Sequence, residues 1–176
     1  MQILFRFLAY VVSVAVSNKY AVGYWVVGPV FGTAVVVFAW KKAKSNWPGA
    51  AAYIAASTLI YALVYRVSSL RWGNDSSELT EYFAGPFPVA VLMGSVLLPC
   101  AHAIILGRPR ALAWRTAAAL AASFYLLTLL RYLNQELEMG PHVSWMPVTV
   151  GVWQGVYLVS FFIVSAGENK AGHSRE

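Results

Sequence analysis

An apolar run of 38 residues opens the chain, from Ile3 to Trp40, and only Ser17-Asn18-Lys19 interrupts it. At 1.5 Å per residue, one continuous helix of this length would measure about 57 Å, nearly twice the hydrocarbon thickness of a bilayer. The run must therefore turn back at the polar tripeptide. We expect two membrane spans here, at about 3–17 and 20–40, joined by a tight turn.

The rest of the chain repeats this pattern of apolar runs separated by short polar segments. Only 11% of the 176 residues are charged, against about 25% in a soluble domain. The sequence therefore predicts an all-α integral membrane protein, a compact bundle of six transmembrane helices. The four remaining spans are expected at about 50–65, 87–106, 112–130 and 146–165.

The first span has a second interpretation, because Ala15-Val16-Ser17 resembles a signal-peptide cleavage site. A cleaved signal would leave five spans. We favour an uncleaved first span, since a single basic residue, Arg6, precedes the apolar run from Phe7 to Ser17, and apolar sequence resumes within a few residues. In either case we expect a single transmembrane domain over 1–167 and a polar cytoplasmic tail over 168–176.

The basic residues predict the orientation. With the N-terminus inside, nine of the 13 Lys and Arg residues fall on the cytoplasmic side, as the positive-inside rule requires. We therefore expect both termini to be cytoplasmic, in an inner (cell) membrane of bacterial or archaeal type. The formal net charge of +6 is spread over short clusters between apolar runs, so a nucleic-acid partner has little support and the lipid bilayer is the expected partner.

The predicted outer face has the longer loops, at about 67–86 and 131–145, and working surfaces are often built from loops. Asp75-Ser-Ser-Glu78 has the spacing of a capping box. Leu79, Tyr82 and Phe83 then fall on one helical face. We expect a short interfacial helix at 77–84, which either covers the bundle or lies on the membrane surface without a ligand.

The only dense polar cluster also falls on this outer face. Arg131, Gln135 and Glu138 follow helical spacing at the end of the fifth span, and Arg66 ends the third. The arginine fork binds carboxylate or phosphate bidentately, which favours a small polar or anionic ligand. The alternative is a solvated rim of screened ion pairs. The candidate ligand-binding residues are Arg66, Arg71, Trp72, Arg131, Gln135, Glu138 and His142.

Glycines four residues apart predict close helix packing at Gly28 and Gly32 and at Gly151 and Gly155. The same small-residue strips would also suit a partner membrane subunit.

His102 and Gln154 are the most polar side chains within the spans, and such residues are candidates for function. With no second histidine at ligand spacing and one cysteine, Cys100, we predict no metal site and no cofactor.

No catalytic motif is present: nucleophile elbows, P-loops, HExxH and dinucleotide glycine fingerprints are all missing from the sequence. We predict no catalytic residue. The first functional hypothesis is binding or transport of a small polar or anionic solute at an outward-facing site, alone or as the membrane subunit of a larger transporter. Size, span number and cytoplasmic termini resemble those of the substrate-binding subunits of vitamin-uptake transporters, in architecture only. The alternatives are an accessory or assembly subunit of a membrane complex and, third, a membrane enzyme acting on a lipid or quinone.

Overall fold

The computed structural model is all-helical over the residues it describes, which are 2–19, 24–39, 46–69, 83, 85–107, 109–136 and 148–160. No strand occurs among them. The helices are α1 (Gln2–Lys19), α2 (Tyr24–Phe38), α4 (Trp47–Ser68), α6 (Pro86–Ile105) and α7 (Arg110–Glu136), followed by a helix at Val148–Ser160 that we call the closing helix. The expected interfacial helix at 77–84 lies, apart from Phe83, outside the described residues.

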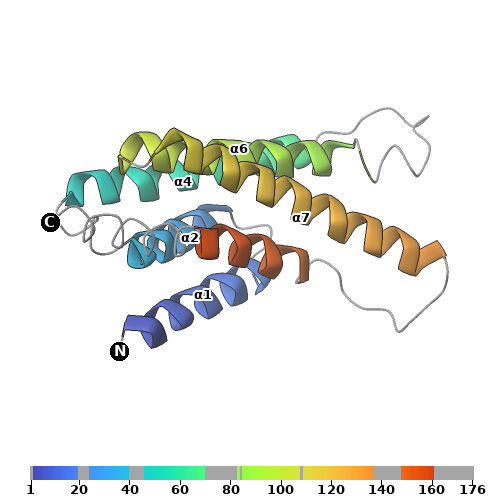
Figure 1. Cartoon of the computed structure of the whole chain (residues 1–176), viewed down its shortest axis with the longest axis horizontal. Coiled ribbons are helices and arrows are strands. Elements are labelled where there is room, and N and C mark those ends of the chain that lie inside the picture. The colour runs from blue at the N-terminus through green and yellow to red at the C-terminus, as the bar shows by residue number, and fades with distance from the viewer. Residues whose placement is uncertain are drawn as a thin grey trace, which may run out of the picture.

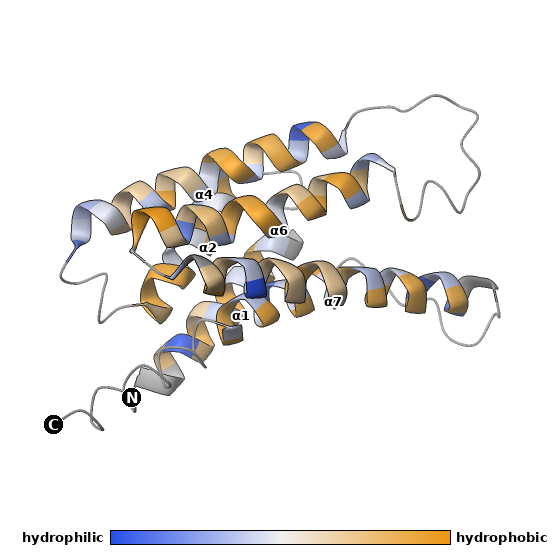
Figure 2. Ribbon diagram, turned by 45° about the horizontal axis from the view of Figure 1, so that its top comes forward, coloured by the Kyte–Doolittle hydropathy of each residue, from blue (hydrophilic) through white to orange (hydrophobic). Residues whose placement is uncertain are grey.

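Three of these helices are long and apolar enough to cross a membrane: Trp47–Ser68, Pro86–Ile105 and Ala111–Asn134. The apolar segments Phe5–Ser17, Trp25–Phe38 and Val148–Ser160 are shorter. Figure 2 shows apolar residues on the outward as well as the inward faces of α4, α6 and α7. The prediction of an all-helical membrane bundle is confirmed at this level.

Local chemistry explains where the helices begin and end. Asn46 caps α4, because its Oδ1 accepts a hydrogen bond from the Gly49 N–H at 3.1 Å. Gly107 has a φ of 64° just after α6, which is the left-handed conformation that commonly ends a helix and that glycine adopts without strain. Pro109 then precedes α7, so α6 and α7 are joined by a tight turn and run antiparallel.

The helices pack in chain order, α1 on α2, α2 on α4, α4 on α6 and α6 on α7. The closing helix lies between α1 and α7 (Figure 1). Its side chains bond to α1, α4 and α6, and Tyr157 packs edge-on against Phe31 of α2 at 5.2 Å between ring centroids. The closing helix thus connects four of the helices that precede it in the chain.

Candidate functional site

A cavity of about 330 Å³ lies among five of the helices. It sits toward the end of the bundle where α1 and α4 finish and where α2, α6 and the closing helix begin (Figure 1). Along α4 it extends from Ser68 to Ile60, about 12 Å at 1.5 Å per residue. The lining residues are Ser17 (α1), Val27 (α2), Ile60, Tyr61, Val64, Tyr65 and Ser68 (α4), Phe87, Ala90, Val91, Gly94 and Leu98 (α6), and Thr149, Val150, Trp153 and Gln154 (closing helix).

The wall of this cavity is mainly apolar and aromatic, and none of the described lining residues is charged. Its polar groups are neutral: hydroxyls of Ser, Thr and Tyr, the Trp153 indole and the Gln154 amide. A charged molecule seated there would lose its hydration without a counter-charge, at a large cost in free energy. The cavity is therefore suited to an uncharged, mainly apolar molecule.

Gly94 helps to keep the cavity open on the α6 side. A Cβ atom at this position would stand 3.3 Å from Val64 Cγ2 and 4.0 Å from the Trp153 ring. The indole is held in place by a hydrogen bond from its Nε1 to Ser95 Oγ at 2.9 Å. The Ser95 hydroxyl donates in turn to the Val91 carbonyl at 2.8 Å. A rigid indole opposite a residue without a side chain leaves a defined space between α6 and the closing helix.

A chain of buried hydrogen bonds joins α1 to the closing helix at the cavity. Gln154, 1% exposed, donates from Nε2 to Ser17 Oγ at 2.7 Å. Ser17 donates its own hydroxyl proton to the Ser13 carbonyl at 2.7 Å. Gln154 Oε1 is buried and has no hydrogen-bond partner among the described residues. The phenol of Tyr61 lies within hydrogen-bonding reach of the same amide.

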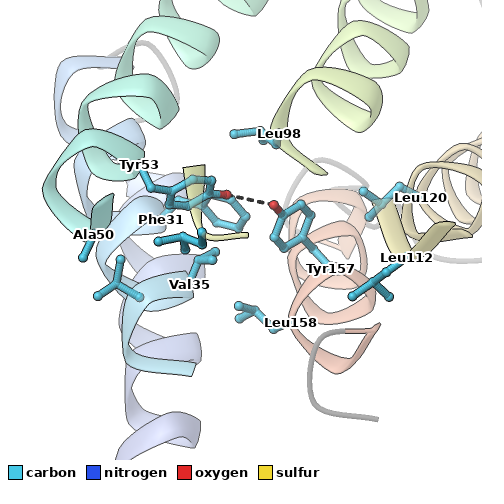
Figure 3. Close-up of a cluster of buried hydrophobic side chains, with 11 residues drawn as sticks. Phe31, Val35, Ala50, Tyr53, Leu98, Leu112, Leu120, Tyr157 and Leu158 are labelled. Carbon is cyan, nitrogen blue, oxygen red and sulfur yellow. Dashed lines mark hydrogen bonds between the residues drawn. The ribbon is translucent and has the colours of Figure 1, made fainter. Parts of the chain in front are cut away.

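A second buried polar group lies away from the cavity. The hydroxyls of Tyr53 and Tyr157 form a hydrogen bond of 2.8 Å between α4 and the closing helix (Figure 3). The His102 ring packs against both, with centroids 5.1 Å from Tyr53 and 6.5 Å from Tyr157. All three side chains are fully buried. These contacts join three helices within the core.

The sequence-predicted outer cluster is described only in part. Arg66 and Arg131 are both exposed, toward the carboxyl ends of α4 and α7. Neither lines the cavity. Over their described lengths, α4 and α7 each pack on α6 and not on each other. The backbone of Gln135 belongs to α7, while its side chain, together with Arg71, Trp72, Glu138 and His142, lies outside the described residues.

The four glycines predicted to pack against other helices have two kinds of surroundings. A Cβ atom on Gly28 would be 2.5 Å from Thr58 Cα, and one on Gly32 would be 3.0 Å from Ile54 Cα. Both glycines of α2 therefore face the backbone of α4. Gly151 and Gly155 instead face side chains of α1, and the Tyr10 hydroxyl donates to the Gly151 carbonyl at 3.0 Å.

Gln154 and His102 could be identified from the sequence as polar residues within the spans, but the cavity around Gln154 was not predicted. One signal was available: Ile60, Tyr61, Val64, Tyr65 and Ser68 share one face of α4 by their spacing of three and four residues. Their partners on four other helices could not be found from spacing. Among the described residues, no group of three or more His, Cys, Asp or Glu side chains could hold a metal ion.

Comparison with protein-family models, with curated proteins and with solved structures found no match to this chain.

Proposed function

We propose that this chain is a membrane-embedded binding protein for a small, uncharged and mainly apolar molecule. In this proposal the bundle has six spans with both termini cytoplasmic, in a bacterial or archaeal-type cell membrane. Its large exposed apolar side chains support contact with lipid, since Phe5, Leu59, Ile104 and Trp114 are each more than 60% exposed. Such a surface would be an aggregation hazard in water.

The cavity is the observation that carries the proposal. Its volume of about 330 Å³ falls within the range of small-molecule sites, roughly 300–1,000 Å³. The cavity lies at the helix ends that are predicted to face outward. The ligand would therefore enter from the outer leaflet or from the outer aqueous side. The uncharged wall favours a more apolar ligand than the anionic solute expected from the arginines. Binding of an anion by the outer arginines stays a separate prediction.

Equilibrium dialysis with naphthalene tests this function, with equal detergent on both sides and the purified protein on one. The natural sequence should bind naphthalene saturably. Val91→Phe adds a ring to the cavity wall and should weaken binding at least about tenfold, because the volume is then occupied. Val96→Phe makes the same change on the same helix at a position that is 37% exposed and outside the cavity. It should bind as the natural sequence does.

Two results would contradict the proposed function: no saturable binding by the natural sequence, or equal binding by Val91→Phe and Val96→Phe. The accessory-subunit and enzyme hypotheses stay predictions from the sequence. A monodisperse monomer that binds naphthalene would argue against an obligate subunit.

A further inference from the structure

One cavity-lining side chain contains a buried polar atom without a hydrogen-bond partner among the described residues. This atom is Gln154 Oε1. Two other such atoms, on Ser13 and Thr116, belong to residues outside the cavity wall. A buried acceptor left without a donor is costly in free energy, so a ligand that supplies the donor gains affinity from this position.

The hydrogen bonds around Gln154 fix which atom of the amide is available. The Ser17 hydroxyl has a single proton, and it is donated to the Ser13 carbonyl. Ser17 Oγ can therefore only accept from Gln154, which directs Nε2 toward α1. Oε1 is then the atom left over, and it accepts hydrogen bonds but cannot donate them.

The position of Oε1 limits how a ligand reaches it. This atom exposes less than 1 Å², so a donor must come within hydrogen-bonding distance through a small shift of the cavity wall. Tyr61 is the wall residue beside the amide. Since no described lining residue is charged, a neutral donor such as a hydroxyl or N–H group is favoured over an ammonium group.

We propose that Gln154 is the specificity-determining residue of the cavity and selects uncharged ligands that donate a hydrogen bond over ligands that only accept one. The inference rests on the proposed function and names the chemical class of its ligand: a small apolar body bearing a hydroxyl or N–H group at its buried end. Ser17 is a positioning residue, because it acts through the orientation of the amide.

Three probes of nearly equal shape test this selection by the same dialysis measurement. They are 1-naphthol, which donates; 1-cyanonaphthalene, which only accepts; and naphthalene, which does neither. The natural sequence should bind 1-naphthol roughly tenfold more tightly than 1-cyanonaphthalene, the ratio expected from one buried hydrogen bond. In Gln154→Met, which keeps the length of the side chain, this preference should fall to about one.

Ser17→Ala provides a second test that does not depend on losing affinity. Without the serine oxygen, Nε2 has no acceptor on α1, and the Tyr61 phenol is the remaining wall group that can orient the amide. The variant should then bind 1-cyanonaphthalene more tightly than the natural sequence does, approaching its affinity for 1-naphthol. A merely structural role for Ser17 would weaken all three probes together.

Equal binding of 1-naphthol and 1-cyanonaphthalene by the natural sequence would overturn the inference, as would a preference that survives in Gln154→Met. Both results are compatible with saturable naphthalene binding that Val91→Phe removes, in which case the proposed function stands and only the selection by Gln154 fails. Absence of naphthalene binding would overturn both.

Discussion

Gly28 determines how closely α2 approaches α4. A Cβ atom there would stand 2.5 Å from Thr58 Cα. The backbones of α2 and α4 therefore lie closer together than any side chain at position 28 would allow. The approach brings Ser57 Oγ within 2.9 Å of the Gly28 carbonyl, to which it donates a buried hydrogen bond. Close packing of small residues and hydrogen bonds between helices are the main sources of helix association in lipid.

We therefore expect Gly28→Ala to lower the free energy of unfolding by about 1–3 kcal/mol, since the methyl group meets backbone atoms that cannot move aside alone. Gly151→Ala is the matched control. Its Cβ would lie 3.7 Å from Val14 Cγ1, an ordinary contact, and alanine favours helix by up to about 1 kcal/mol over glycine. Unfolding in detergent, followed by circular dichroism, compares the two. Equal stability would mean that α2 and α4 separate readily.

The hydrogen bond between Tyr53 and Tyr157 predicts a coupled pair. Tyr53→Phe should cost about 1–3 kcal/mol, because it leaves the Tyr157 hydroxyl buried without this partner. The double variant Tyr53→Phe/Tyr157→Phe should cost less than the sum of the two single changes. Their unfolding free energies, measured in the same detergent, form a double-mutant cycle. Strict additivity would show that the 2.8 Å contact contributes no coupling.

These residues also show what spacing can and cannot predict. Glycines four residues apart are local in sequence, so their shared helix face could be inferred directly. Tyr53 and Tyr157 are 104 positions apart, and neither has a periodicity that would identify the other. The same holds for Gln154 and Ser17, whose pairing makes the candidate site. Polar groups within spans could be identified individually, but their partners depend on the packing.

Among the helices, α4 has the clearest start signal. Asn46 Oδ1 accepts a hydrogen bond from the Gly49 N–H. Pro48 suits the first turn, because N–H groups there have no acceptor within the helix and the missing N–H of proline costs no hydrogen bond. Asn46→Ala should lower the free energy of unfolding by about 0.5–2 kcal/mol through the loss of the cap. Asn46→Ser keeps a capping oxygen and should be close to the natural sequence. If both variants unfold alike, tertiary packing alone determines where α4 begins.

The apolar runs predicted where the helices lie better than where they end. The helix at the third apolar run, expected at 50–65, extends over Trp47–Ser68, and the helix at the fifth, expected at 112–130, extends over Arg110–Glu136. Hydropathy marks the part that avoids water, whereas a helix continues through polar residues as long as its backbone bonds are made. The complete wall of the cavity could not be predicted, because five helices each contribute only part of it.

The orientation of the whole bundle is tested by labelling single cysteines. In a Cys100→Ala background, Ser45→Cys and Ser76→Cys should react with a membrane-impermeant maleimide from opposite sides, Ser76→Cys from outside. The expectation follows from the distribution of Lys and Arg. Permeabilised cells are the control, since both variants should react there. Reaction of both from the same side in intact cells would overturn the predicted topology.

The contacts of the closing helix with the earlier helices have a consequence for biosynthesis. Translation produces α1, α2, α4, α6 and α7 first, at about 5–20 residues per second. Until Val148–Ser160 arrives, Ser17, Tyr53 and Ser95 lack the partners that Gln154, Tyr157 and Trp153 provide. For several seconds these polar side chains thus lack their hydrogen bonds to the closing helix. Insertion factors that shield such groups would act on this protein late, at its sixth helix.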